Sequence, residues 1–278
     1  MTFGHRPARD FPYFDAPPIG LAHRGGALHP DNRGRENTLE AFATAVGLGL
    51  RYVETDVHAT RDGVVVAFHD ACLDRVTDGS GSIADRTWAQ VSQVRVDGRY
   101  AVPRLDQCLL AFPHTRFNID IKAPGAVAPL WRLIQEHDAA DRVCVGSFSM
   151  QRLRAFRALA GDRVATAAGP AEVAALRFRP GRVPPGRDIG QVLQVPETIT
   201  WPVRHTGSHG AGRTVTRLVT PALVSRAHAR GMQVHVWTVD DADAMRRLLD
   251  LGVDGLVSDR IDVLAEVLAE RGAWPPTS

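Results

Sequence analysis

The chain has 278 residues, 44% of them hydrophobic, which is enough to bury the core of one closed α/β barrel. Its formal net charge of +2 gives no indication of a nucleic-acid or anionic-membrane partner. The three cysteines lack the spacing of a metal site or a disulfide framework, so we expect reduced thiols in a cytoplasmic protein.

The N-terminal region, residues 1–16, is rich in proline and shows no periodicity. We therefore expect an arm that packs on a single domain covering residues 17–275. This region has no apolar core of the kind found in signal peptides, and no later segment reaches the roughly 18 consecutive apolar residues of a membrane-spanning helix. We expect no integral membrane segment.

The first predicted strand, residues 19–22, is followed directly by His23-Arg24-Gly25-Gly26. Glycines at this place allow the backbone to approach a ligand closely. A polar loop then leads to a helix that begins near Leu39, and either Asn37 or Thr38 can cap it.

The second predicted strand, residues 51–57, carries two acids, Glu54 and Asp56. Side chains two apart on a strand point to the same face. Two carboxylates held that close repel each other unless a cation lies between them, and a divalent metal with oxygen ligands would serve. The alternative is that one acid pairs with an arginine and the other lies at the surface.

An Asp62-Gly63 turn follows, and an apolar run then leads to His69 and Asp70. We interpret Asp70 as a residue that orients His69 or closes the turn. Residues 71–103 are too many for an ordinary connection, so we expect a small insertion subdomain over the site.

The third barrel strand, residues 116–121, repeats the geometry of the second, because Asp120 and Lys122 are two apart. Of the 33 basic residues, 32 are arginine and Lys122 is the one lysine. We expect it where a compact ammonium group is needed and a wide guanidinium would not fit.

From residue 126 onward, helices and strands alternate. We expect strands at 143–147, 164–168, 190–195, 233–239 and 255–258. We expect the segment from the end of the strand at 190–195 to about Val219 to be irregular. Eight strand-helix units predict a single (β/α)8 TIM barrel, whose chemistry lies at the carboxyl ends of the strands. The polar residues named above fall at these ends, so they should converge on one mouth.

These motifs together resemble the glycerophosphodiester phosphodiesterase family. The matching segments occur in the family's order and span nearly the whole barrel: 23–25, 36–38, 54–70, 73–75, 118–122, 147–148, 236–239 and 254–259. The resemblance implies a hydrolase that converts glycerophosphodiesters to sn-glycerol 3-phosphate and an alcohol, with one divalent cation, Mg²⁺ or Ca²⁺.

The resemblance also implies a role for each candidate residue. The metal ligands would be Glu54, Asp56 and Asp120. The acid–base pair would be His23 and His69, and the phosphate would be held by Arg24 and Lys122. We expect Phe148 and Trp237 to form walls against the substrate. The family most often has Glu at the position of Asp120, so the metal preference and the headgroup stay open.

Three alternatives stay open as well. A phospholipase D-like enzyme acting on lysophospholipids would need an apolar rim near the mouth. A barrel that binds a phosphodiester without turning it over would be expected to have lost at least one of the acids or histidines. A barrel of the carbohydrate-isomerase type would not need Arg24 and Lys122 beside its carboxylates. We expect a small-molecule partner and no nucleic acid, and the sequence does not assign an oligomeric state.

Overall fold

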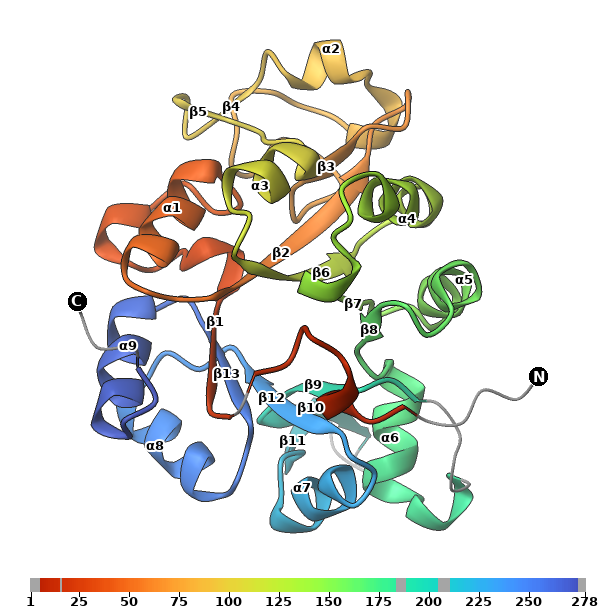
Figure 1. Cartoon of the computed structure of the whole chain (residues 1–278), viewed down its shortest axis with the longest axis vertical. Helices are drawn as coiled ribbons and strands as arrows, with labels where there is room; N and C mark the ends of the chain where they lie inside the picture. The colour runs from red at the N-terminus through yellow and green to blue at the C-terminus, as the bar shows by residue number, and fades with distance from the viewer. Residues whose placement is uncertain (1–5, 16, 184–188, 205–210, 275–278) are drawn as a thin grey trace.

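Eight parallel strands form the centre of the molecule and helices surround them (Figure 1). The structure is a computed structural model that describes residues 6–15, 17–183, 189–204 and 211–274. The strands follow one another around the barrel in the order β8 (Ala165–Thr166), β7 (Val143–Gly146), β6 (Arg116–Ile121), β2 (Tyr52–Ala59), β1 (Ile19–Ala22), β13 (Gly255–Ser258), β12 (Gln233–Trp237) and β9 (Val192–Pro196). A parallel bridge between Ala167 and Val192 joins the two ends of this path, so the barrel is nearly closed. The predicted TIM-barrel fold is confirmed.

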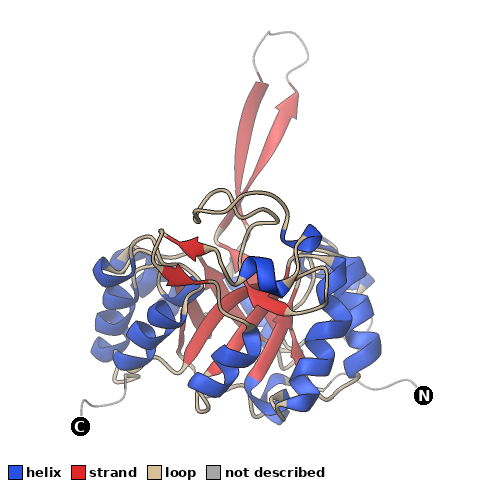
Figure 2. Ribbon diagram, turned by 90° about the horizontal axis from the view of Figure 1, so that it is seen from above, coloured by secondary structure: helices blue, strands red, loops and turns tan. Residues whose placement is uncertain are grey.

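The outer layer consists of α-helices that pack their apolar sides against the strands (Figure 2). These helices are α1 (Leu39–Gly47), α3 (Leu105–Ala111), α4 (Val127–Glu136), α5 (Met150–Ala160), α6 (Pro170–Phe178), α7 (Pro221–His228), α8 (Ala242–Asp250) and α9 (Ile261–Glu270). Short 3₁₀ turns are η1 (Ala8–Asp10), η2 (His23–Gly25), η3 (Pro30–Asn32), η4 (Ile83–Asp85), η5 (Pro124–Ala126), η6 (Ala140–Arg142) and η7 (Pro180–Arg182). No helix within the described ranges has the length and apolar character needed to cross a membrane.

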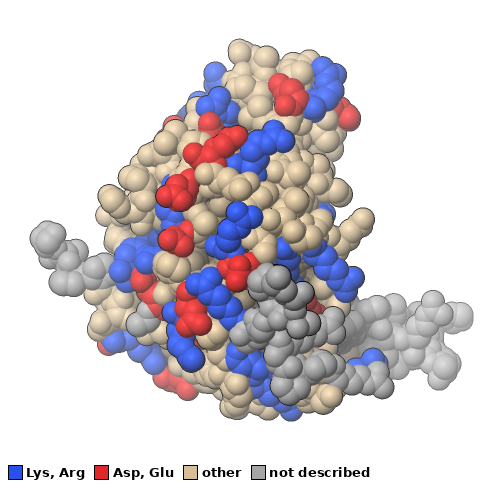
Figure 3. All heavy atoms as spheres, turned by 45° about the vertical axis from the view of Figure 1, so that its right-hand side comes forward, with Lys and Arg blue, Asp and Glu red and all other residues tan. Residues whose placement is uncertain are grey.

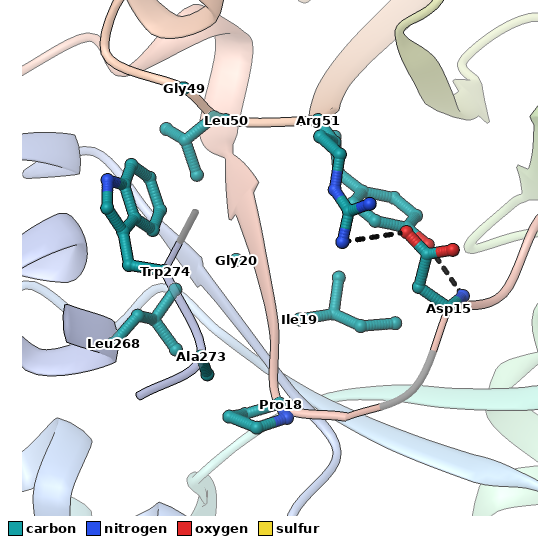
Figure 4. A pocket seen from close by; sticks show the side chains of 11 residues that line it. Asp15, Pro18, Ile19, Gly20, Gly49, Leu50, Arg51, Leu268, Ala273 and Trp274 are labelled. Carbon is teal, nitrogen blue, oxygen red and sulfur yellow. Dashed lines mark hydrogen bonds and ion pairs between the residues drawn. The ribbon is translucent and has the colours of Figure 1, made fainter. Parts of the chain in front are cut away.

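The N-terminal residues 6–15 lie across the amino end of the barrel. Phe11 and Tyr13 are buried there in an apolar cluster that includes Ile19 at the start of β1 and Tyr52 at the start of β2. The Tyr52 hydroxyl donates a hydrogen bond to the Tyr13 carbonyl (2.8 Å). A pocket of only about 30 Å³ lies at this end, beside the ion pair between Arg51 and Asp15 (3.2 Å; Figure 4). It is too small for an organic substrate.

His235 in β12 is buried inside the barrel, and this burial lowers its pKa to about 3. Histidine in an unfolded chain has a pKa of about 6.5, so between these values the unfolded state binds the extra proton. The free energy of unfolding is therefore not reduced by His235 above about pH 6.5, and it falls as the pH drops from there toward 3. We expect His235 to cost about 2 kcal/mol of unfolding free energy between pH 7 and pH 5.

Urea unfolding of the wild-type chain and of His235→Gln across this pH range measures the effect. The variant should lose less stability than the wild type on acidification, whatever its stability at pH 7. Equal losses in the two proteins would contradict the prediction.

Residues 71–103 extend from the barrel after β3 (Val65–Ala67), which pairs with β2. They contain α2 (Trp88–Val91) and a small antiparallel pair, β4 (Arg95–Val96) and β5 (Tyr100–Ala101). Their apolar side chains form a separate buried cluster with the end of β3: Val66, Phe68, Leu73, Ile83, Val91, Val96 and Val102.

The segment expected to be irregular before Val219 is instead a β-hairpin, so this expectation is wrong. Its strands are β10 (Thr198–Arg204) and β11 (Ala211–Arg217), and Figure 2 shows the hairpin extending far beyond the other strands. Both strands are rich in β-branched residues, which favour extended backbone. The base of the hairpin is fixed to the barrel, because the Arg247 guanidinium makes two hydrogen bonds of 2.9 Å to the Glu197 carboxylate.

Candidate active site

The carboxyl ends of the strands open into a cavity of about 570 Å³. The cavity has a polar end and an apolar end. Every candidate residue predicted from the sequence lines it: His23, Arg24, Glu54, Asp56, His69, Asp120, Lys122, Phe148 and Trp237. The structure thus brings together side chains from six strands or the segments that follow them, at the edge where TIM barrels place their chemistry.

Three buried carboxylates lie on two neighbouring strands. Asp56 of β2 is directly opposite Asp120 of β6, and Glu54 lies two residues before Asp56. The exposed fractions of these three residues are 1% for Asp56, 8% for Asp120 and 7% for Glu54. Neither acid of β2 therefore lies at the surface, which contradicts that alternative, although Arg24 does contact Asp56 (Nε to Oδ2, 3.4 Å).

Lys122 lies between two of these carboxylates. Its Nζ is 2.8 Å from Asp56 Oδ1 and 2.7 Å from Asp120 Oδ2. Burial lowers the pKa of Lys122, but the two carboxylates outweigh it and raise the pKa, so the ammonium stays charged. A compact ammonium can reach both oxygens at once, which fits the expectation for the one lysine of the chain.

The carboxylates differ in how easily they ionise. Burial and then the charge of Asp56 raise the pKa of Glu54 to about 7. Burial also raises the pKa of Asp120, although Lys122 opposes this effect. For Asp56, burial is outweighed by Lys122 and Arg24, so its pKa is lowered. Lys122 and Arg24 therefore do not fully offset the negative charge of the three carboxylates.

His23 is held by a carboxylate from the far end of the chain. Its Nδ1 donates to Asp259 Oδ1 (2.8 Å), and its Nε2 lies 3.9 Å from Glu54 Oε2. Asp259 is fixed in turn, because its backbone N–H and the Ser258 hydroxyl both donate to Asp240 Oδ1. Burial lowers the pKa of His23, but the hydrogen bond to Asp259 and the charge of Glu54 outweigh it and raise the pKa.

His69 is held in the same way by its neighbour. Its Nδ1 donates to Asp70 Oδ1 (2.5 Å), so Asp70 orients His69. Burial raises the pKa of Asp70, but hydrogen bonds from Arg75 and His69 outweigh it and lower the pKa to about 2. Both histidines therefore face a carboxylate with Nδ1, which leaves Nε2 as the nitrogen that can exchange a proton in the cavity.

Arg24 adopts a left-handed backbone conformation (φ 51°, ψ 29°), which is rare for a residue with a side chain. Its backbone N–H donates to Glu54 (3.1 Å), and its guanidinium donates to Glu36 Oε1 (3.1 Å). The Asn37 backbone N–H donates to the Arg24 carbonyl (2.9 Å). This contact helps to hold the strained residue beside the carboxylates.

Some residues that build the site were not selected from the sequence. Asn37 also has a positive φ of 58°, and its amide donates to Asp56 (3.1 Å), whereas Thr38 is the residue that caps α1. Glu36 contacts Arg24, and Asp259 holds His23. Asp259 directly follows β13, so the rule that strand ends carry chemistry would have found it.

The apolar end of the cavity begins at Phe148 and Trp237, whose rings are 5.5 Å apart in an edge-to-face arrangement. Phe148 is 60% exposed and Phe178 is 47% exposed, which is unusual for large aromatic side chains beside a core. We call eight further apolar lining residues the apolar wall: Pro170, Val173, Ala174, Phe178, Val195, Pro196, Ile199 and Leu218.

The donor set fits a divalent metal by its chemistry. Three buried carboxylates supply hard oxygen ligands, and Asp120 Oδ1 is buried without a hydrogen-bond partner. Burial and the charge of Asp56 raise the pKa of Glu54, and a cation beside this carboxylate would favour its charged form. As the side chains lie, no group of three or more acidic, histidine or cysteine residues in the described part of the chain is gathered closely enough to hold an ion. Lys122 contacts two of the three carboxylates instead.

On the face seen in Figure 3, basic and acidic side chains are interspersed. This face shows no large patch of one sign, in keeping with the net charge of +2.

Comparisons with known proteins place the chain among related sequences and structures. The glycerophosphoryl diester phosphodiesterase family model matches residues 23–263. A probable glycerophosphodiester phosphodiesterase 2 of Mycobacterium tuberculosis is 38% identical over 268 residues, covering 93% of this chain and 97% of that protein. A lysophospholipase D of Rattus norvegicus is 27% identical, covering 91% of this chain and 87% of that one.

Among solved structures, an Oleispira antarctica phosphodiesterase in complex with the product sn-glycerol-3-phosphate has a TM-score of 0.72. It is 21% identical, covers 91% of this chain and 97% of that chain, and shows the shared fold. The family match and the Mycobacterium relative confirm the enzyme class predicted from the motifs, glycerophosphodiester phosphodiesterase. The chain belongs to the glycerophosphoryl diester phosphodiesterase family.

Proposed function

We propose that the protein hydrolyses glycerophosphodiesters to sn-glycerol 3-phosphate and an alcohol, with His23 and His69 as the acid–base pair. The observation that carries this proposal is that each histidine holds Nδ1 against an aspartate and keeps Nε2 for the cavity. The product named for the Oleispira antarctica structure gives further support.

The two histidines divide the proton transfers. One accepts the proton of the attacking hydroxyl, and the other donates a proton to the oxygen of the departing alcohol. If water attacks, sn-glycerol 3-phosphate forms directly. If the glycerol hydroxyl of the substrate attacks, the alcohol leaves a cyclic glycerol phosphate, which one water then opens to sn-glycerol 3-phosphate with the two histidines in exchanged roles. Imidazole is suited to both tasks near neutral pH. The carboxylates of Asp259 and Asp70 stabilise the imidazolium form of whichever ring holds the proton.

The phosphodiester anion requires positive charge beside its non-bridging oxygens. This positive charge must stabilise the transition state more strongly than the bound substrate. Arg24 and Lys122 lie in the cavity lining and supply it. Glu54, Asp56 and Asp120 would hold one divalent cation, Mg²⁺ or Ca²⁺. When bound, such a cation polarises the phosphoryl group and offsets developing charge.

The assay for this proposal follows release of sn-glycerol 3-phosphate from glycerophosphocholine and glycerophosphoethanolamine. Treatment with EDTA should abolish turnover, and Mg²⁺ or Ca²⁺ should restore it. If neither substrate turns over with any cation, the proposal fails and lysophospholipids are tested next. Failure with these as well would make a barrel that only binds phosphodiesters the better description.

A second candidate substrate is a lysophospholipid, and the apolar wall favours it. A glycerophosphodiester is small and polar, whereas this cavity continues past Trp237 over a surface of aliphatic and aromatic side chains. One hydrocarbon chain would cover this surface and remove it from water. The lysophospholipase D of Rattus norvegicus, which is related over most of its length, supports the same class of substrate.

A variant of the apolar wall separates the two substrates. Phe178→Ala should lower kcat/KM for lysophosphatidylcholine by about tenfold, because an apolar contact with the chain is lost, and leave glycerophosphocholine turnover unchanged. Leu159→Ala on α5 is the control, since Leu159 is 43% exposed and lies outside the cavity lining. An equal loss with both substrates would argue against a chain-binding role for Phe178.

A further inference from the structure

Arg75 belongs to the 71–103 segment, yet its side chain contacts two carboxylates at the edge of the active site. Its Nη1 and Nη2 donate to Glu36 Oε2 (3.0 Å) and Oε1 (2.7 Å). Its Nε donates to Asp70 Oδ2. One guanidinium thus uses three separate donors on two acids.

Each of these carboxylates also holds a side chain of the proposed machinery. The second oxygen of Asp70 accepts from His69 Nδ1 (2.5 Å), and Glu36 Oε1 accepts from Arg24 Nη1 (3.1 Å). The contacts therefore form a continuous chain from the imidazole to the phosphate-binding arginine, with Arg75 at its centre. We call His69, Asp70, Arg75, Glu36 and Arg24 the charge chain.

The two ends of the charge chain come from different parts of the barrel. Asp70 follows β3, whereas Glu36 precedes α1. Without the guanidinium, two carboxylates that share one cation would repel each other, and each would be free to rotate. The side chains they hold would lose their fixed orientation, and small displacements of reacting groups reduce rates strongly.

The 71–103 segment has contacts of its own that do not involve Arg75. The segment has its own buried apolar cluster, and the Trp88 backbone N–H donates to Asp62 (2.9 Å), which ties the segment to the turn after β2. Loss of the Arg75 side chain should therefore leave the segment in place.

We propose that Arg75 is a positioning residue, which fixes the orientation of His69 through Asp70 and of Arg24 through Glu36. This inference rests on the proposed function for its kinetic consequences. Arginine is required because its planar fork binds one carboxylate with two donors while Nε binds another, which an ammonium group cannot reproduce.

The kinetic test compares Arg75→Ala and Arg75→Lys with Arg86→Ala. Arg86 lies in the same segment and contacts the Ser80 carbonyl (3.0 Å), away from both acids. We expect Arg75→Ala to lower kcat for glycerophosphocholine by about 10-fold to 100-fold with a melting temperature close to that of wild type. Arg75→Lys should recover little, and millimolar guanidinium should partly restore Arg75→Ala but not change Arg86→Ala. Wild-type kcat in both Arg75 variants would overturn the proposal, and so would a loss that guanidinium leaves unchanged.

A second measurement needs no turnover. Diethyl pyrocarbonate modifies accessible histidines, and peptide mass spectrometry gives the rate at His69 relative to the exposed His114 of the same protein. We expect this ratio to change several-fold in Arg75→Ala and to stay at the wild-type value in Arg86→Ala. An unchanged ratio would overturn the proposal. A changed ratio in a protein that hydrolyses no glycerophosphodiester would uphold the role of Arg75 and reject the proposed function.

Discussion

Replacing His69 with alanine is expected to lower kcat for glycerophosphocholine by roughly 10²-fold to 10⁴-fold, the usual contribution of a positioned acid or base. His23→Ala should have an effect of similar size, because each histidine would serve one of two obligatory proton transfers. Neither imidazole is a core group, so circular dichroism and thermal melting should show an intact fold. The measurement is release of sn-glycerol 3-phosphate at saturating Mg²⁺ or Ca²⁺.

The matched control is His114→Ala. His114 is exposed on the connection between α3 and β6, at the amino end of the barrel, and it should be replaceable without loss of turnover. If either His23→Ala or His69→Ala kept near-normal activity, that histidine would have to be removed from the acid–base pair.

The second large effect is expected at Asp56. Asp56→Asn preserves the shape of the side chain but removes the charge that Lys122 and Arg24 contact and that a divalent cation would use. We expect kcat/KM to fall on the order of 10³-fold and calorimetric binding of Mg²⁺ or Ca²⁺ to weaken by at least about tenfold.

Asp106→Asn is the control for this substitution, since Asp106 pairs with Arg104 (2.8 Å) and does not line the cavity. Both proteins should melt cooperatively. Wild-type metal affinity in Asp56→Asn would show that Asp56 serves the protein's own cations and is not a ligand. Full wild-type activity in EDTA would reject the metal itself.

Much of the barrel could be predicted because its signals are local. The strands at 19–22, 116–121 and 255–258 have the expected bounds, since each is one short apolar run whose limits lie within a few residues of it. The hairpin of β10 and β11 could not be read in this way. Its strands are stabilised by pairing with each other outside the barrel, as in Ile199 opposite Thr216. The sequence has no helical or barrel periodicity there that would predict such a pair.

In the active site, too, local sequence spacing identified some features, whereas others depend on the tertiary structure. Spacing two residues apart identified Glu54 with Asp56 and Asp120 with Lys122, because side-chain direction within a strand follows from the sequence. The position of Lys122 between Asp56 and Asp120 depends instead on the register of β2 with β6. The hydrogen bond between His23 and Asp259 joins residues 236 positions apart, which only the closed barrel can bring together.

The burial of Phe11 and Tyr13 at the amino end of the barrel limits the routes by which molecules enter and leave the cavity. Because these side chains fill that end, exchange between the cavity and solvent passes the mouth at the carboxyl ends of the strands. Substrate, departing alcohol and the charged phosphate product would therefore compete for one passage. We expect sn-glycerol 3-phosphate to inhibit competitively, and an acylated glycerol phosphate product, whose chain would lie against Phe178, to leave more slowly than sn-glycerol 3-phosphate.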